Sequence, residues 1–250
     1  MKIIIRKLLD HIGFLFFCIY YRINSLLGDE LIIYIEYSGL GDHLFYSHIP
    51  RLIKQQKKFK KVYISLDNKY RNDEIKKLVW DLNPYVDGYK KGRYPTYKFL
   101  INLKDKNLLD TIGYMYGLNI NDSEPEIYYS PNLINSLENK TLYDPNYISN
   151  CGNLDSKKIS DYFVQEDIKI DFKMKLRPIN IDYKLTNEEL AAKTLYEFID
   201  ILFSVKRIYC LTTGTATLCA AIRKTAYVLY GDGVTLQHHH SKINNYIKLE

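Results

Sequence analysis

Tyr37-Ser38-Gly39-Leu40-Gly41-Asp42-His43 is the stretch that decides the fold, because of what lies on either side of it. Residues 31–37, Leu-Ile-Ile-Tyr-Ile-Glu-Tyr, form a β-branched and aromatic run typical of a buried strand. After the turn, apolar residues recur at helical spacing from Leu44 to Ile53. A strand, a two-glycine turn and a helix open many nucleotide-binding α/β domains, because the helix N-terminus attracts anions. The third glycine of a nicotinamide fingerprint is absent, and the turn offers a carboxylate, Asp42, instead.

A second strand–turn–helix unit lies near the other end of the chain. Residues 205–211 are predicted to form a strand, residues 212–217 a turn, and the residues from Leu218 onward a helix. Residues 226–230 are predicted to form the next strand. Four threonines around Gly214 would suit a diphosphate at the helix N-terminus. The alternative is that these threonines only cap the helix.

The two units together resemble the heptosyltransferase-like glycosyltransferases of bacteria, glycosyltransferase family nine. In that family a Gly-x-Gly-Asp turn after the first strand carries the base, and an Asp-Thr-Gly-x-x-His turn in the second half holds the donor phosphates. The residues that match the two motifs are Gly39, Gly41, Asp42, Thr213 and Gly214. Thr212 stands where the family has Asp, and Thr217 stands where it has His.

The resemblance implies an α/β fold of GT-B type, with two facing Rossmann-like halves and a reduced C-terminal half. It implies inverting, metal-independent transfer of a sugar from a nucleotide-sugar to a lipid-linked or polysaccharide acceptor in lipopolysaccharide or capsule synthesis. Heptose is the sugar in the enzymes that it resembles. Asp42 is the implied catalytic base, since a carboxylate can take the proton of an acceptor hydroxyl. No metal ligand and no cofactor is expected.

The implied substrate- and donor-binding residues lie in the two turns and in one further segment. Residues 156–159 resemble a Lys-Arg-Trp segment that contacts the donor in the family, so Lys157 joins the set. The predicted binding residues are Gly39, Gly41, His43, Lys157, Thr213, Gly214, Thr215 and Thr217.

Strands that alternate with helices between the two turns predict parallel pairing. We expect a strand at 61–66 and helices at 72–82 and 108–116, the last closed by Gly117. A further helix is expected to run to Leu202, with Thr186 as N-cap and Glu189 completing a capping box.

The chain is expected to divide into three parts. Residues 1–27 would form an amphipathic N-terminal helix, residues 28–140 a Rossmann-like acceptor domain, and residues 141–250 the nucleotide-sugar-binding domain. The apolar run in the N-terminal part is about half of the ~20 residues that a spanning helix needs. We expect this helix either to lie on a membrane surface or to pack on its own domain. The first alternative fits a lipid-linked acceptor.

Composition limits the partners. Lys and Arg exceed Asp and Glu by 35 to 29, and the run 51–61 holds six cations without an acid. No nucleic-acid recognition module accompanies this run, so nucleic acid is not an expected partner; a solvated helix end or an anionic membrane surface fits it better. The four cysteines show no paired spacing, which favours reduced thiols and a cytoplasmic location, with the inner face of the membrane as an option. His238-His239-His240 more simply forms a polar loop than a zinc site.

Two other functions stay open at this stage. A catalytically reduced relative, acting as a binding or scaffold subunit, would fit the missing Asp and His of the second motif. An unrelated α/β nucleotide-binding enzyme, such as a hydrolase or an epimerase, is less favoured, because Gly-x-Ser-x-Gly, Walker and Tyr-x-x-x-Lys motifs are absent from the sequence.

Overall fold

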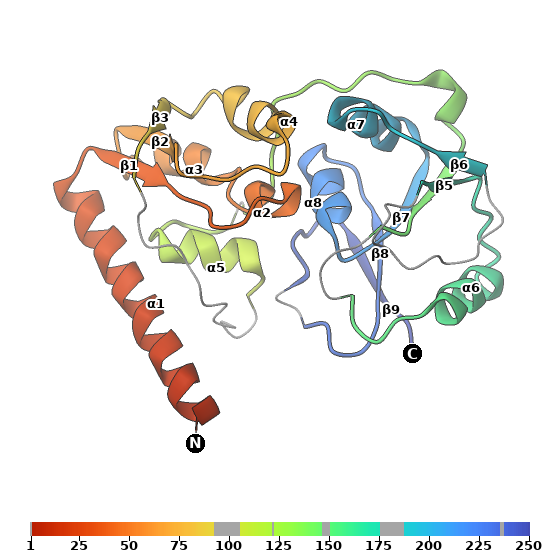
Figure 1. The fold of residues 1–250 in the computed structure, drawn as a ribbon, viewed down its shortest axis with the longest axis horizontal. Coiled ribbons are helices and arrows are strands. Elements are labelled where there is room, and N and C mark those ends of the chain that lie inside the picture. The colour runs from red at the N-terminus through yellow and green to blue at the C-terminus, as the bar shows by residue number, and fades with distance from the viewer. Residues whose placement is uncertain (1, 93–105, 122, 147–150, 176–187, 236–237) are drawn as a thin grey trace. The chain divides into compact units, whose positions relative to one another are not determined.

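The computed structural model describes residues 2–92, 106–121, 123–146, 151–175, 188–235 and 238–250, without the side chains of 2–10 and 25–27. The chain forms two compact units, residues 1–128 and residues 129–250. Each unit contains strands and helices in alternation, as Figure 1 shows. Residues 129–140 pack in the second unit, where the backbone N–H of Ile134 donates to the Ser204 hydroxyl at 2.7 Å.

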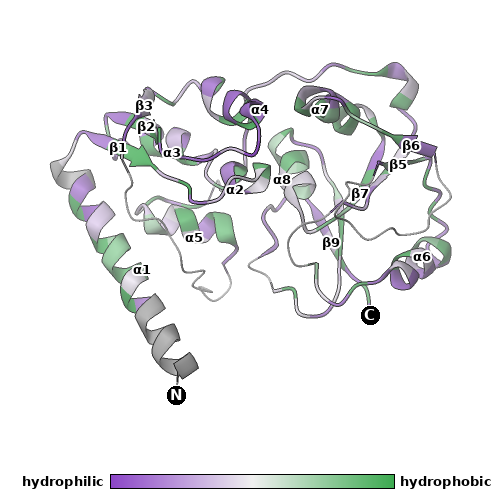
Figure 2. Cartoon of the chain, viewed as in Figure 1, coloured by the Kyte–Doolittle hydropathy of each residue, from purple (hydrophilic) through white to green (hydrophobic). Residues whose placement is uncertain are grey.

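Unit 1 is built on a parallel sheet of the order β1-β2-β3. The strands are β1 (Glu30–Ile33), β2 (Lys61–Ser65) and β3 (Gly88–Lys90). Leu31 lies opposite Val62, and Ile33 lies opposite Ile64. All four of these side chains are buried, and β1 is coloured hydrophobic in Figure 2. The parallel pairing that the alternating pattern predicted is therefore confirmed in this unit.

The described residues of unit 1 also form several helices. They are α1 (Lys2–Leu27), α2 (Leu40–Leu44), α3 (Ile49–Gln55), α4 (Asp73–Lys76) with a π-helix (Lys77–Asp81), and α5 (Leu108–Met115). The helix expected from Leu44 to Ile53 is two helices, and Pro50 lies in the first turn of the second one. Proline is tolerated there, because the first backbone N–H groups of a helix have no intrahelical partner. Gly117, with φ +69°, follows α5 as predicted.

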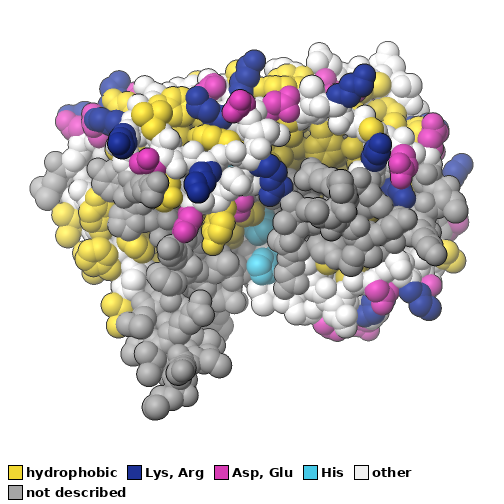
Figure 3. All heavy atoms as spheres, in the orientation of Figure 1, with side chains coloured by type: hydrophobic (Ala, Val, Ile, Leu, Met, Phe, Trp, Pro, Cys, Tyr) yellow, Lys and Arg dark blue, Asp and Glu magenta, His cyan; other side chains and the backbone are white. Residues whose placement is uncertain are grey.

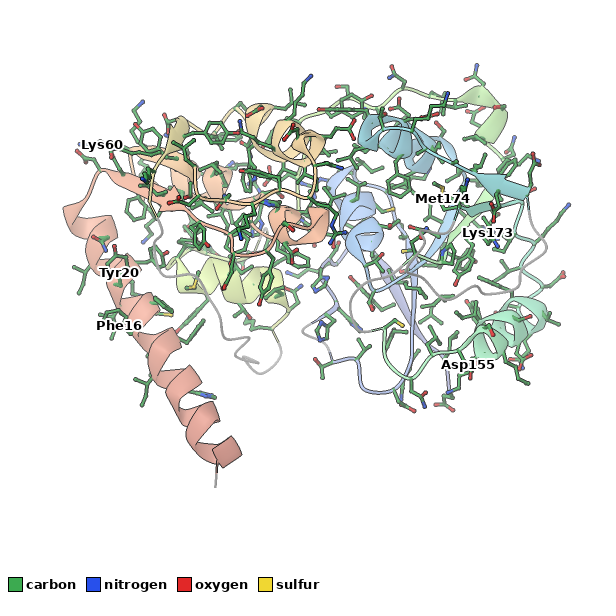
Figure 4. All side chains as sticks on the ribbon, in the orientation of Figure 1. Phe16, Tyr20, Lys60, Asp155, Lys173 and Met174 are labelled. Atoms are coloured by element: carbon green, nitrogen blue, oxygen red, sulfur yellow. The ribbon has the colours of Figure 1, made fainter. Side chains whose placement is uncertain are left out.

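The cationic run 51–61 is largely paired with acids that are distant in the sequence. Arg51 binds Glu126 at 2.8 Å, and Lys54 and Lys61 bind the two oxygens of Asp87 at 2.5 and 3.0 Å. Lys60, labelled in Figure 4, binds Asp29 at 2.9 Å. The hydrogen bonds from the two lysines and from Val62 N–H lower the pKa of Asp87 to about 2. Much of this positive charge is therefore neutralised within unit 1.

Unit 2 contains one six-stranded parallel sheet of the order β6-β5-β4-β7-β8-β9. Its strands are β4 (Thr141–Asp144), β5 (Phe172–Met174), β6 (Glu188–Leu190), β7 (Arg207–Leu211), β8 (Tyr227–Tyr230) and β9 (Asn245–Lys248). The order is that of a doubly wound nucleotide-binding fold, 3-2-1-4-5-6. The chain places β5 and β6 on one side of β4, and then β7, β8 and β9 on the other side, so the strand order reverses between β4 and β7.

Among its described residues, unit 2 also contains a 3₁₀-helix and the helices α6, α7 and α8. They are Asn135–Leu137, α6 (Ser156–Gln165), α7 (Leu195–Ser204) and α8 (Gly214–Ala221). Phe163 of α6 packs edge-on against Tyr143 and Tyr209, with ring centroids 5.4 and 5.3 Å apart. Asp155, labelled in Figure 4, begins α6 by accepting a hydrogen bond from the N–H of Lys158 at 2.8 Å. The capped helix thus covers the centre of the sheet with its aromatic side chain.

The expected helix before Leu202 is wrong in its first half. Residues 188–190 form β6, and the helix begins only at Leu195. The N-cap lies eight residues further on: Thr194 accepts from the N–H of Glu197 at 3.0 Å, and Glu197 accepts from the N–H of Lys193, the residue before the cap, at 2.7 Å. Pairing with β5 overrides the helical propensity of the Glu-rich segment. Thr186 itself lies outside the described residues.

Two glycines allow a backbone crossing at the end of β8. The N–H of Gly231 donates to the carbonyl of Cys151 at 2.9 Å, and the N–H of Asn153 donates to the carbonyl of Asp232 at 2.8 Å. A Cβ on Gly152, which has φ +80°, would lie 2.4 Å from the carbonyl oxygen of Gly231. No larger residue fits here without moving one of the two backbone segments.

We expect Gly152→Ala to lower the free energy of unfolding by roughly 2–4 kcal/mol, through backbone strain and overpacking together. Gly233→Ala is the matched control, because Gly233 also has a positive φ, +93°, but a Cβ there meets nothing within 4 Å. The control should cost only about 1–2 kcal/mol. Urea unfolding of both variants measures the difference. Equal losses would show that the crossing tolerates a methyl group.

Candidate active site

The first glycine turn holds Asp42 by its own backbone. Asp42 is the third residue of α2, and its Oδ2 accepts a hydrogen bond from the N–H of Gly39 at 3.0 Å. A Cβ on Gly39 would lie 2.6 Å from that oxygen. Glycine is therefore needed at position 39 for the carboxylate to come back over the turn. The turn lies beyond the carboxyl end of β1, where ligands of open α/β sheets bind.

Burial and charge act on Asp42 in opposite directions. Burial raises the pKa of the carboxyl group above 3.8, while the Gly39 N–H and the Arg71 guanidinium lower it. Nη2 of Arg71 lies 3.7 Å from the point that a Cβ on Gly39 would occupy, so both charged groups flank this point. The N–H of Arg71 also donates to the carbonyl of Ser38 at 2.9 Å. The loop after β2 thus brings a cation beside the candidate base.

His43 is fixed inside unit 1 by both nitrogens of its ring. The indole N–H of Trp80 donates to Nδ1 at 3.0 Å, and Nε2 lies 3.0 Å from the carbonyl oxygen of Lys69. Because an indole can only donate, Nδ1 accepts and Nε2 carries the proton. The ring is buried and stacks on Tyr70 at 4.6 Å, and burial lowers its pKa to about 4. These contacts make His43 a positioning residue for α2; a substrate contact through its side chain stays a prediction.

The second turn begins α8 directly after β7. Thr213 is the N-cap of the helix, and its hydroxyl accepts from the N–H of Thr215 at 3.2 Å. The helix begins at Gly214, four residues earlier than the predicted start at Leu218. Thr217 is fully buried, and its hydroxyl lies 3.4 Å from the carbonyl oxygen of Thr213. Helix capping therefore accounts for the contacts of Thr213, and the half-buried Thr213 and Gly214 are the residues of this turn with access to solvent.

Asp144 joins this turn to the neighbouring strand. It ends β4, is 2% exposed, and its Oδ2 accepts a hydrogen bond from the hydroxyl of Thr215 at 2.6 Å. Its Oδ1 accepts two more, from N and Nδ2 of Asn146 at 3.0 and 2.8 Å. The strand order reverses between β4 and β7, and open α/β sheets bind ligands at such a switch point. The buried carboxylate thus anchors the loop at the switch point of the sheet.

Lys157 lies in the first turn of α6. Its Nζ forms an ion pair with Asp161, one helical turn further on, at 2.5 Å, and its side chain is 83% exposed. This carboxylate raises the pKa of Lys157. The first glycine turn brings together Gly39, Gly41, Asp42 and His43, and the second brings together Thr213, Gly214, Thr215 and Thr217. A donor contact from Lys157 stays a prediction.

The histidine run near the C-terminus packs internally. His239 stacks on Tyr246 with ring centroids 4.0 Å apart, and burial lowers the pKa of His240 to about 3. Within the described part of the chain, no three His, Cys, Asp or Glu side chains are grouped to hold a metal ion. All four cysteines are buried and free, in agreement with the expectation of reduced thiols.

Three residues at the two turns were not predicted from the sequence: Asp144, Arg71 and Trp80. Asp144 ends a Thr-Leu-Tyr-Asp run, which is a short strand followed by a carboxylate, and that pattern was the available signal. Arg71 and Trp80 carry no local signal of this kind, because they reach α2 from 29 and 37 residues away.

Comparisons with known proteins give structural matches only. No family model matches the chain, and no curated protein matches it. Among solved structures, the dodecameric iron-containing heptosyltransferase TibC of enterotoxigenic E. coli, in complex with ADP-D-β-D-heptose, matches with a TM-score of 0.58 and 12% identity. This match covers 86% of our chain and 62% of TibC.

Two further solved structures match over most of their own lengths. The glycosyl transferase family 9 protein of Veillonella parvula matches with a TM-score of 0.57 and 11% identity, over 88% of our chain and 86% of its own. The E. coli ADP-heptose lipopolysaccharide heptosyltransferase II matches with a TM-score of 0.55 and 12% identity, over 86% and 89%. The chain therefore has the GT-B-like α/β fold of these glycosyltransferases, so the predicted resemblance and the predicted α/β fold class are confirmed. The expected reduction of the C-terminal half is not seen, because unit 2 holds the six-stranded sheet while three strands are described in unit 1.

The buried ring of His43, the residue after Asp42, predicts that the stability of the protein depends on pH. Its pKa is about 4 in the folded protein against 6.5 in the unfolded chain, so the folded state favours the neutral ring. The contribution of neutral His43 to the free energy of unfolding is complete above pH 6.5 and is lost as the pH falls from 6.5 through 4. We expect His43→Gln to reduce the loss of stability between pH 7 and pH 5 by roughly 2 kcal/mol. Urea unfolding at the two pH values measures this, and equal losses in both proteins would contradict it.

Proposed function

We propose that the chain is a glycosyltransferase that moves a sugar from a nucleoside diphosphate sugar to a glycan or lipid-linked acceptor in cell-surface glycan synthesis. The observation that carries the proposal is the pair of glycine turns, each placed after a parallel strand of its own unit, within a fold shared with heptosyltransferases. TibC and the E. coli enzyme are named for heptose, which makes an ADP-heptose the first donor to test. The reaction inverts the anomeric carbon.

Asp42 acts as the general base in this proposal. As the acceptor oxygen attacks the anomeric carbon, its proton passes to the Asp42 carboxylate, which contributes ~10²–10⁴-fold in rate. Burial raises the pKa of Asp42, and a base with a raised pKa takes a proton more readily. Arg71 opposes this shift and favours the ionised form. Gly39 N–H fixes one carboxylate oxygen, Oδ2, and the proposal assigns the proton of the acceptor to Oδ1.

In this proposal, the turn Thr213–Thr217 at the start of α8, here called the α8 turn, stabilises the leaving group. The bond between the anomeric carbon and the phosphate oxygen breaks, and its electrons pass to the nucleoside diphosphate. Backbone N–H groups in the first turn of a helix stabilise such an anion, because they have no intrahelical partner. Gly214 lets the phosphates approach the backbone closely, and the Thr213 hydroxyl lies beside it. No metal-dependent step is required by this arrangement of charges.

The acceptor sets the location of the enzyme. A nucleotide-sugar donor and buried, reduced cysteines fit the cytoplasm, and a lipid-linked acceptor would bring the protein to the inner face of the cytoplasmic membrane. None of the helices in the described ranges combines the length and apolar character needed to cross a bilayer. Because the proposed acceptor is lipid-linked, we propose attachment at the membrane surface as the form of association.

A binding or scaffold subunit is the second candidate. The observation in its favour is that the two threonines that replace the Asp and His of the family motif, Thr212 and Thr217, are buried at 3% and 0% exposure. Their hydroxyls are therefore poorly placed to take over the contacts of a charged pair. Nucleotide-sugar turnover separates the two functions, since a scaffold would not turn over the donor whether or not it binds it.

We expect Asp42→Asn to preserve folding and to lower the transfer rate by about 10²–10⁴-fold. The amide oxygen of Asn can still accept from Gly39 N–H, whereas Asp42→Ala loses that bond and about 1 kcal/mol of stability as well. In the wild type, the rate should fall at acidic pH as Asp42 takes up a proton at a pKa above 3.8. Turnover with ADP-heptose and thermal unfolding are the two measurements. An Asn variant with near-normal turnover removes Asp42 from the mechanism.

The α8 turn predicts a contrast between two variants. Gly214→Val should weaken nucleotide binding by about tenfold or more, because the side chain blocks the approach to the backbone. Thr217→Val, which removes a buried hydroxyl and adds no bulk toward the ligand, should change binding by no more than about twofold. Calorimetric titration with ADP and ADP-heptose compares the two. A wild type that binds neither ligand at millimolar concentration contradicts the transferase and leaves the scaffold function.

A further inference from the structure

Helix α1 has one face that belongs to the core of unit 1. Phe14, Cys18 and Tyr21 are 4%, 5% and 2% exposed. Phe14 stacks on Tyr114 of α5 with ring centroids 6.2 Å apart, and Tyr21 contacts Tyr116 at 4.6 Å. The helix is therefore held against α5 along this face, as one of the two alternatives for the N-terminal segment predicted.

The other face of α1 is apolar and exposed. Five large side chains spaced three and four residues apart form a stripe, here called the α1 stripe: Ile12, Leu15, Phe16, Ile19 and Ile23, which are 55%, 59%, 61%, 57% and 49% exposed. Figure 3 shows hydrophobic side chains along this outer edge of unit 1, and Figure 4 labels Phe16 on it. Monomeric proteins rarely leave such a continuous apolar surface in water without a partner.

The sequence of α1 is basic, and its one described cation, Arg22, lies over the ring of Tyr114 on the α5 side. Its 26 residues contain Lys2, Arg6, Lys7 and Arg22, against one acid, Asp10. The same spacing of three and four residues continues in the sequence toward the N-terminus, through Leu8 and Ile5. An apolar stripe accompanied by Lys and Arg is the pattern of a helix that lies in the interface of an anionic bilayer. A second copy of the same helix would bring like charges together, which disfavours self-association.

We propose that the α1 stripe docks this protein flat on an anionic membrane surface, with the stripe among the lipid headgroups and the opposite face kept on α5. One face of the helix then packs in the core of unit 1 and the other lies on the bilayer. The two alternatives for the N-terminal segment, packing on its own domain and lying on a membrane, each describe one of these faces. Delivery of a lipid-linked acceptor to unit 1 by this docking rests on the proposed function, whereas the docking itself does not.

Vesicle co-sedimentation tests the proposal with the full chain. The double variant Phe16→Glu/Ile19→Glu places two charges in the stripe. The double variant Leu133→Glu/Val164→Glu makes the same change in charge at exposed apolar positions of unit 2, which are 51% and 77% exposed. Vesicles of phosphatidylcholine mixed with phosphatidylglycerol are compared with vesicles of phosphatidylcholine alone. Thermal unfolding checks each variant, and Phe16→Ser/Ile19→Ser replaces the charged pair if that variant fails to fold.

We expect the wild type to bind the anionic vesicles, the stripe variant to bind at least about tenfold more weakly, and the control variant to bind like the wild type. High salt should weaken binding only in part, because it screens the charges and leaves the apolar contact. Equal binding by both double variants, or no binding by the wild type, would overturn the proposal. A stripe variant that converts a vesicle-indifferent dimer into a monomer would assign the stripe to a second copy of the chain.

Nucleotide-sugar titration of the same proteins distinguishes this proposal from the proposed function. The stripe variant should keep the donor affinity of the wild type, since the α1 stripe and the α8 turn belong to different units. Loss of vesicle binding with intact donor binding supports the docking surface. Vesicle binding without any donor binding supports the docking surface and contradicts the transferase.

Discussion

The parallel pairing of β4 with β7 is the constraint on which unit 2 depends. Tyr143 lies opposite Tyr209 in this pair, and the chain leaves the two strands toward opposite edges of the sheet. Because their connections diverge, the carboxyl ends of the two strands are left uncovered side by side. Asp144 and the α8 turn occupy these two ends, and the 2.6 Å bond from the hydroxyl of Thr215 to Asp144 joins them. The order of the strands thus creates the site, and the buried carboxylate fixes its shape.

Unit 1 builds its site in a different way, from a glycine and a locked ring. The carboxylate of Asp42 folds back onto the N–H of Gly39, while the neighbouring His43 is held by Trp80 and Lys69. Buried polar groups are costly unless they are paired, and every ring nitrogen of His43 has a partner. The α2 helix is short, so these side-chain bonds supply the rigidity that a longer helix would obtain from its own backbone.

The sequence was sufficient to predict the helices and strands that are apolar and bounded by glycine. Residues 207–211, with the turn and helix after them, and the end of α5 at Gly117 were predictable because local signals agree with the tertiary fold. The sequence was insufficient for β4 and β9, four-residue strands that are preceded by polar residues in the sequence and whose pairing partners are distant in the chain. Glu188–Leu190 shows the same effect, since pairing with β5 overrides helix-forming residues. Asp144 was missed together with its strand.

Backbone amide NMR of the isotopically labelled chain, titrated with ADP and with ADP-heptose, tests the central claim most directly. We predict saturable shifts of the amide signals of Thr213 and Gly214, the residues with access to solvent at the start of α8, since their backbone would bind the diphosphate. The signals of α1 should stay in place in the same titration. Shifts confined to other parts of the chain, or none at millimolar ligand, would contradict a donor site at this turn.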